Sequence, residues 1–246
     1  MNHSPHAYPR RPLTTVIAVV GCDGAGKSTL AADVMQALHD QGAAEFLYLG
    51  QSSGIIAEAI RRLPWIGAAF GRYLVRRAER AHHTQSRPPD LATALVVHLL
   101  SRWRAHKFRR LLALSRRGVM VVADRYPQAE MPGFYFDGPG LDHAAAGTWL
   151  VKKIARREQR LYAWMASHVP TLVIRLNIDA ETAHARKPDH KLSMLQDKVR
   201  VIPGLRFNGA DILDLDAVAP YAQVLARAVA ASRAAIDAAR AQNNAM

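Results

Sequence analysis

The chain has 246 residues, half of them apolar, which is enough for one sizeable α/β domain with its own core. Its net charge of +13 fits an anionic ligand such as a nucleotide, and also nucleic acid or an acidic membrane surface. The single cysteine, Cys22, excludes a disulfide framework and favours a reducing cytoplasm.

The predicted elements of the first third alternate between strands and helices. Residues 1–13 lack the apolar core of a signal peptide and are expected to form a flexible tail. A buried strand is predicted over Thr14–Val20, a helix over Lys27–Gln41 and a second strand over Glu45–Leu49. No apolar run approaches the roughly 18–20 residues of a membrane span.

The basic segment 54–83 predicts two helical pieces, Ile55–Leu63 and Ile66–Arg80, separated by Pro64. Its arginines alternate with apolar and aromatic residues. A solvated helix face is one interpretation, a cover over an anionic acceptor is a second, and peripheral contact with a membrane is a third.

The remaining two thirds of the chain continue the alternation. The predictions are a helix over Leu91–Arg117, a strand over Val119–Ala123, a loop over Ala129–Leu141, a helix over Asp142–His168 with Asp142 as its N-cap, strands over Thr171–Asn177 and Ile212–Leu215, a helix over Ala217–Ala241, and a flexible tail over 242–246. Strands that alternate with helices imply parallel pairing. We therefore expect a single α/β domain over 14–241 with a five-stranded parallel sheet.

The strongest motif follows the first predicted strand. Residues 21–28 match the pattern of a phosphate-binding loop, which is Gly, any four residues, Gly, Lys and then Ser or Thr. The motif lies between a predicted strand and a predicted helix. Backbone N–H groups and the helix N-terminus form a concave site for phosphate oxygens. The residues expected to bind the phosphates of ATP are Gly21, Asp23, Gly24, Ala25, Gly26, Lys27, Ser28 and Thr29.

Asp23 lies inside this loop, where a carboxylate beside a triphosphate is electrostatically unfavourable. It would be tolerated if it met an acceptor hydroxyl, a water on Mg²⁺ or a basic side chain. The alternative is a carboxylate that only stabilises the turn.

A second carboxylate, Asp124, follows the strand Val119–Ala123, and Arg125 comes directly after it. Ligands of open α/β sheets bind at the carboxyl ends of the strands. Ser28 and Asp124 are therefore candidate ligands of Mg²⁺, and Arg125 is a candidate anion-binding residue. A local ion pair between Asp124 and Arg125 is the alternative.

Together, the loop with its internal Asp23 and the later Asp124-Arg125-Tyr126 resemble the thymidylate kinase family of P-loop kinases. Weaker similarity covers Leu99–His106, Asn177–Lys187 and Ile212–Ala217, so the resemblance spans about residues 14–240. It implies transfer of the γ-phosphoryl of ATP, with Mg²⁺, to a nucleoside monophosphate such as dTMP.

The resemblance also implies roles for residues outside the phosphate loop. Lys27, Asp23 and a lid cation, Arg186, would act in catalysis, and a mobile lid would cover about 186–204. One subclass carries an arginine at the position of Gly24, so the cation here should come from the lid, where Lys187 and Lys191 are also available. The residues expected to contact the acceptor are Arg102, Arg104, Asp124, Arg125 and Gln128.

Two departures from the family fall on the acceptor side. The family's Arg-Glu-Pro after the second strand is replaced by Gly50-Gln51-Ser52, and its Ser-rich stretch after Asp-Arg-Tyr is absent. A sugar or another non-nucleotide acceptor, an NTP-binding regulatory protein and a nucleic-acid-binding module are therefore alternative functions. A homodimer is compatible with all of them. The histidines show no ligand spacing for zinc.

Overall fold

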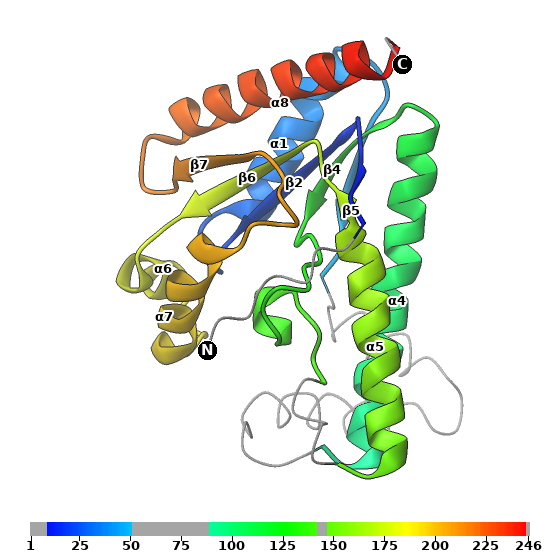
Figure 1. Cartoon of the computed structure of the whole chain (residues 1–246). Coiled ribbons are helices and arrows are strands. Elements are labelled where there is room, and N and C mark those ends of the chain that lie inside the picture. Colours follow the sequence, from blue (N-terminus) through cyan, green and yellow to red (C-terminus); the bar gives the residue numbers. More distant parts are fainter. Residues whose placement is uncertain (1–8, 51–88, 142–146, 245–246) are drawn as a thin grey trace, which may run out of the picture.

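The structure, a computed structural model, describes residues 9–50, 89–141 and 147–244. The predicted helical pieces within the basic segment, and Asp142, lie outside these residues. Five parallel strands form the central sheet, in the order β3-β4-β2-β6-β7, which confirms the predicted α/β fold (Figure 1). The strands are β2 (Val16–Gly21), β3 (Ala44–Tyr48), β4 (Met120–Asp124), β6 (Leu172–Asn177) and β7 (Ile212–Asp216).

The central strand β2 lies between β4 and β6. Ile17 is opposite Val122 of β4 and Leu172 of β6, and the other pairs follow in parallel register. Because the strands are parallel, their carboxyl ends lie at one edge of the sheet. Gly21 and Asp124, which end β2 and β4, therefore come to the same edge.

Helices cover both faces of the sheet. On one face lie α1 (Lys27–His39) and α8 (Tyr221–Asn244), and on the other α4 (Leu91–Arg116) and α5 (Trp149–Ser167), whose N-terminal halves extend beyond the sheet (Figure 1). None of the helices in the described ranges is long and apolar enough to cross a bilayer.

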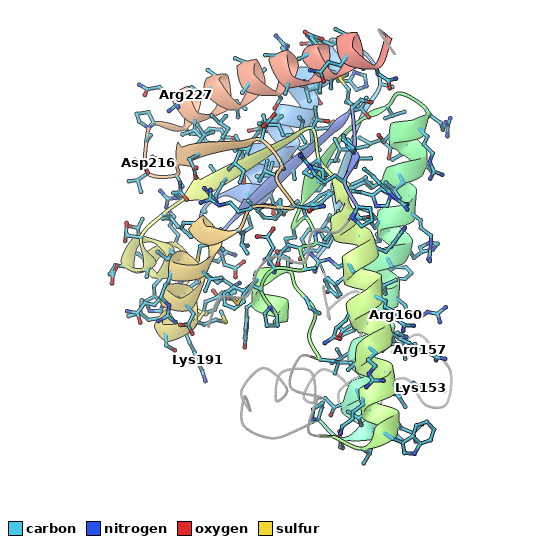
Figure 2. All side chains as sticks on the ribbon, in the orientation of Figure 1. Lys153, Arg157, Arg160, Lys191, Asp216 and Arg227 are labelled. Atoms are coloured by element: carbon cyan, nitrogen blue, oxygen red, sulfur yellow. The ribbon has the colours of Figure 1, made fainter. Side chains whose placement is uncertain are left out.

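A buried carboxylate joins α4 to α5. Glu158 accepts hydrogen bonds from Ser101 Oγ at 2.6 Å and from the N–H groups of Gly140 and Leu141. Burial raises the pKa of Glu158, although these hydrogen bonds oppose the shift. The opposite side of α5 carries exposed cations, among them Lys153, Arg157 and Arg160, which point outward in Figure 2. These cations form a solvated face of α5.

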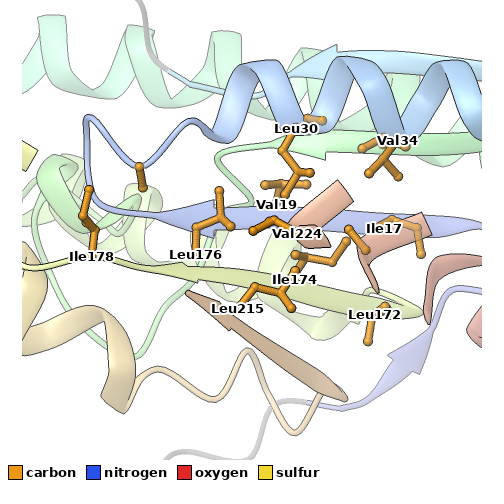
Figure 3. Packing of buried hydrophobic residues seen from close by; sticks show 14 of the residues in the cluster. Ile17, Val19, Leu30, Val34, Leu172, Ile174, Leu176, Ile178, Leu215 and Val224 are labelled. Carbon is orange, nitrogen blue, oxygen red and sulfur yellow. The ribbon is translucent and has the colours of Figure 1, made fainter. Parts of the chain in front are cut away.

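The alternation of side chains along β2 divides the core into two clusters. Ile17 and Val19 pack with Leu30 and Val34 of α1 and with Val224 of α8 (Figure 3). The other face of the strand packs against α4 and α5 through Val16, Ala18, Phe108, Leu111, Tyr162 and Met165. A strand that is apolar on both faces is what a covered parallel sheet requires.

Several predicted boundaries differ from the structure. The helix α5 begins at Trp149 after Thr148, not at Asp142, and a 3-10 turn, η1 (Phe134–Phe136), lies within the predicted loop. The helix α8 begins at Tyr221, after Pro220, and runs through 242–244, which the sequence placed in a flexible tail.

A small parallel pair of strands was not predicted. The strand β1 (Arg11–Pro12) pairs with β5 (His168–Val169). The sequence placed β1 in the N-terminal tail. Thr171 holds the pair to the main sheet, because its hydroxyl donates to Leu13 O at 2.7 Å and accepts from Val16 N at 3.0 Å.

The predicted lid region contains α7 (Leu192–Val201) and the 3-10 turn η3 (Ile202–Gly204), and α6 (Ala180–Arg186) precedes them. These elements follow β6 at the carboxyl edge of the sheet (Figure 1). The side chain of Leu195 anchors α7, because it is fully buried in the core cluster that includes Ile17.

Candidate functional site

The glycine-rich loop connects β2 to α1 and takes conformations that favour glycine. Gly24 has φ +85°, and a Cβ atom at this position would lie 2.7 Å from Ala183 O of α6. Gly26, the N-cap of α1, has φ +86°, and a Cβ atom there would have open space around it. The open space lies beside the unsatisfied N–H groups of the first helical turn, a favourable place for an anion.

Lys27 begins α1 and is folded back onto the loop. Its ammonium donates a hydrogen bond to Cys22 O at 2.7 Å and lies 3.6 Å from Asp23 Oδ1. Burial and the nearby Arg125 lower the pKa of Lys27, against the attraction of Asp23 and Asp124. The ammonium is thus held at the mouth of the loop.

Ser28 and Asp124, the predicted metal ligands, are brought together. Ser28 Oγ donates to Asp124 Oδ2 at 2.6 Å, and the Asp124 carboxylate is fully buried. Burial raises the pKa of Asp124, with Ser28 and Lys27 opposing the shift. The second oxygen, Oδ1, is buried without a hydrogen-bond partner among the described residues.

A hydroxyl and an incompletely satisfied carboxylate are the oxygen donors that Mg²⁺ uses beside a nucleotide. The residues present therefore fit the metal. The described part of the chain contains no cluster of three or more His, Cys, Asp or Glu side chains suited to a metal ion. Phosphate oxygens and water would have to complete the coordination shell.

Asp23 is the centre of a cluster of basic side chains. Its carboxylate accepts from Arg125 Nη2 at 2.6 Å, pairs with Lys198 of α7, and lies 3.8 Å from Nδ1 of His190. Burial alone would raise the pKa of Asp23, but Lys198, Arg125 and Lys27 together hold it well below its usual range. Of the partners that the sequence allowed for Asp23, the structure supplies basic side chains.

Arg125 itself is held in a strained conformation. Its φ of +63° lies in the left-handed region, which is uncommon for residues other than glycine. Arg104 donates to Arg125 O at 2.6 Å and to Asp137 Oδ1 at 2.7 Å. Since Arg104 is nearly fully buried in these contacts, it helps to position the backbone of Arg125.

The other two predicted acceptor residues, Gln128 and Arg102, lie in different surroundings. Gln128 is buried, and its amide donates to Met131 O and Phe136 O while it accepts from the N–H groups of Glu130 and Met131. It organises the loop after β4. Arg102 is exposed on α4 and has no hydrogen bond or ion pair with the described residues of the site.

The predicted lid cation Arg186 is at the C-terminus of α6. Its Nη1 atom lies 3.2 Å from Ala217 O, just after β7, and 3.4 Å from Gly24 O in the loop. The guanidinium is exposed and bridges two backbone segments. Arg186 thus links the phosphate loop to the segment that follows β7.

Lys107 of α4 is a basic residue near the site that the sequence did not single out. Its ammonium donates to Gly50 O and lies 5.2 Å from the ring centre of Tyr48, which Arg125 approaches at 6.0 Å. Burial and the nearby Arg104 lower the pKa of Lys107 to about 8, although Asp137 opposes the shift. No local motif marks it, because its partners come from β3.

A cavity of about 530 Å³ opens beside the loop at the same edge of the sheet. Cys22 and Lys198 contribute to its wall, together with the carboxyl ends of β6 and β7. The lining mixes apolar side chains with carboxylates: Leu176, Ile178, Leu215, Asp179, Asp214 and Asp216. Space therefore exists next to the phosphate loop for a larger group.

Comparison with known proteins shows the family to which the chain belongs. The chain is 52% identical over 222 residues to the uncharacterized ATP-binding protein YghS of Escherichia coli K12, covering 90% of this chain and 94% of the relative. It is 43% identical over 213 residues to the uncharacterized ATP-binding protein YghR of the same strain, covering 87% and 84%. The chain belongs to the YghS/YghR family.

The YghS/YghR family is consistent with a P-loop fold, because both relatives are named as ATP-binding. No protein-family model matches the chain. The family names describe nucleotide binding in the relatives and do not specify a reaction or an acceptor.

Proposed function

We propose that the protein is an ATP-dependent phosphotransferase, similar to thymidylate kinase, that moves the γ-phosphoryl of ATP to a nucleoside monophosphate such as dTMP. The observation that carries this proposal is the hydrogen bond from Ser28 to Asp124 beside the buried ammonium of Lys27, at the end of a glycine-rich loop. The names of the two relatives support the ATP part of the proposal.

In this proposal the loop 21–29 holds the phosphates and Lys27 bridges the terminal ones. Ser28 and Asp124 would hold Mg²⁺, which neutralises charge on the phosphates when it is bound. Lys27 must leave Cys22 O and Asp23 to reach a phosphate. Its present contacts keep the ammonium at the loop until then.

On the acceptor side, Arg125 and Lys107 are the cations that support an anionic acceptor. Both lie close to the ring of Tyr48, at the end of β3, in the region where the thymidylate kinase family carries an arginine. Lys107 thus supplies from α4 a positive charge that the strand end lacks. An anionic acceptor such as a nucleoside monophosphate fits these charges.

A non-nucleotide acceptor is the second candidate. Gly50 replaces the family's acceptor-binding arginine, and Arg104 and Gln128 are engaged with the chain's own backbone. Because these side chains are already engaged, we expect an acceptor that carries an anionic group, as dTMP does, but differs from dTMP in its uncharged part. An acceptor screen separates the two candidates.

The test is transfer of label from [γ-³²P]ATP with Mg²⁺ to a panel that contains dTMP, dUMP, other nucleoside monophosphates and sugars. We expect transfer to at least one member, and Lys27→Ala should lower it by about 100-fold or more, because the terminal phosphates lose their ammonium. Circular dichroism checks that the variant is folded. ATP binding without transfer to any acceptor would favour a regulatory nucleotide-binding protein, and normal turnover in the variant would refute the phosphate-loop assignment.

A further inference from the structure

The thymidylate kinase resemblance requires a cation over the transferred phosphoryl group, and the structure offers a different residue from the one the sequence suggests. We propose that Lys198 of α7 is this lid cation, and that Asp23 holds it at the phosphate loop before a nucleotide binds. This inference rests on the proposed phosphotransferase function.

Lys198 is the lid residue that reaches furthest into the site. Its ammonium pairs with the Asp23 carboxylate, and the side chains of Lys198 and Asp23 are only 5% and 6% exposed. The helix that carries it is docked by the buried Leu195, whose carbonyl lies 3.9 Å from Cys22 Sγ in the loop. The position of Lys198 is thus set by packing as well as by charge.

The loop cannot supply the cation itself. A side chain at Gly24 would require a positive φ and would bring its Cβ atom to 2.7 Å from a backbone oxygen of α6. An arginine at this position, as in one subclass of thymidylate kinases, would therefore displace α6. The charge has to come from another element.

Of the other basic residues of the lid, His190 also lies 3.8 Å from Asp23, whereas Arg186, Lys187 and Lys191 form no ion pair with this carboxylate. Arg186 contacts Gly24 O and Ala217 O on the β7 side of the loop. Lys187 and Lys191 are exposed, and Figure 2 shows Lys191 pointing away from the sheet. Lys198 is the buried member of the set, and burial strengthens its interaction with any anion that enters.

The charges around Asp23 leave room for such an anion. Four basic side chains, Lys27, Arg125, His190 and Lys198, lie within 4 Å of this one carboxylate. An ammonium taken out of water needs a counter-ion, and Asp23 provides it while the loop is empty of nucleotide. When phosphate oxygens enter the loop, Lys198 gains a second anionic partner there and neutralises charge that develops during transfer. Asp23 keeps Arg125 as its partner.

The holding role of Asp23 is tested without a nucleotide. Amide hydrogen exchange of residues 192–201 is compared in the wild type, in Asp23→Asn and in Asp197→Asn, which removes an exposed carboxylate of α7 that pairs with Arg200. We expect α7 to exchange about 10-fold faster or more in Asp23→Asn, with α5 unchanged, and no such change in the control. Equal exchange in Asp23→Asn and wild type would overturn the holding role.

The catalytic role is tested with Lys198→Met, Lys198→Arg and the control Arg200→Met, which removes an exposed cation from the same helix. With the acceptor found in the screen, Lys198→Met should lower kcat by about 100-fold while the Kd for ATP changes little, and Lys198→Arg should recover part of kcat. A kcat for Lys198→Met close to that of Arg200→Met would overturn this role. If the wild type binds no ATP, the phosphotransferase function fails, and the exchange experiment still decides whether Asp23 holds α7.

Discussion

At the scale of single residues, Lys107 shows how neighbours that are distant in sequence can shift the pKa of a side chain. Its ammonium is enclosed between Gly50 O and the Tyr48 ring, with Arg104 nearby on the same helix. An amine in this position is harder to protonate than one in water. It is therefore a titrating group near neutral pH, unlike an exposed lysine.

This property predicts a pH-dependent stability. The pKa of Lys107 is about 8 in the folded chain and close to 10.5 in the unfolded chain, so the unfolded state binds more protons between these values. The free energy of unfolding therefore gains a contribution that rises with pH from about 8 to 10.5. Urea titrations at pH 7.5, 9 and 10 should show this rise in the wild type relative to Lys107→Met; parallel profiles would contradict the assignment.

Residues that act through local patterns could be predicted from the sequence, and residues that act through distant partners could not. Lys27, Ser28 and Asp124 follow from the spacing of the loop and from the end of a buried strand, and the structure brings them together. Lys198 pairs with an aspartate 175 positions away. Arg104, which the sequence assigned to the acceptor, donates a hydrogen bond to Asp137, 33 positions away, and the sequence did not predict this contact.

At the scale of secondary-structure elements, α7 combines one fully buried apolar side chain with a buried ion pair, and Val199 packs against the same core while partly buried. Leu195 is fully buried, Lys198 is nearly so, and most other residues of the helix are exposed. A helix of ten residues has little stability of its own in water, so these contacts decide where it lies. A lid that opens without unfolding the sheet is compatible with so small a contact.

Removing the anchor should loosen α7 before it unfolds the chain. In Leu195→Ala, the cavity and the lost burial cost about 2–5 kcal/mol if α7 stays docked. Undocking of α7 limits this loss, so we expect faster amide exchange in residues 192–201 and a smaller change in the global free energy of unfolding. Equal losses of local protection and global stability would show that α7 unfolds only together with the sheet.

The sequence predicted the central elements well and their ends less well. Strands such as Val16–Gly21 and Met120–Asp124 are continuous apolar runs, and such runs identify buried strands. The pair β1–β5 is two residues long on each strand and depends on the Thr171 hydroxyl, which no periodic pattern encodes. The N-terminus of α5 was placed too early, because a polar residue at 142 resembles a cap.

At the scale of the whole molecule, two concentrations of positive charge within residues 9–50, 89–141 and 147–244 have different surroundings. One is the outward face of α5, where the exposed cations near Trp149 form no ion pair with the described residues (Figure 2). The other is the loop site, where Lys27, Arg125 and Lys198 are packed around one carboxylate. Only the second arrangement holds its charges in fixed positions that suit a small polyanion.

Binding of a nucleotide to this site should stabilise the entire fold. A ligand present at 100 times its Kd adds about 2.7 kcal/mol to the free energy of unfolding. For a chain of this size, that corresponds to a rise in Tm of roughly 5–10 °C. We expect this rise with ATP and Mg²⁺, a smaller one with ATP and EDTA, and almost none in Lys27→Ala. An equal rise in Lys27→Ala would place the nucleotide elsewhere.

The chain's only thiol, that of Cys22, lies within the loop and next to α7, where Cys22 is 2% exposed and its sulfur lies 3.9 Å from Leu195 O. Burial raises the pKa of the Cys22 thiol, against the opposing influence of Lys198, which leaves it protonated and unreactive at neutral pH. Oxidants and alkylating agents should therefore modify the Cys22 thiol only when α7 moves away from the loop. The helix α7, which places Lys198 beside the loop, thus also protects the Cys22 thiol from chemical modification.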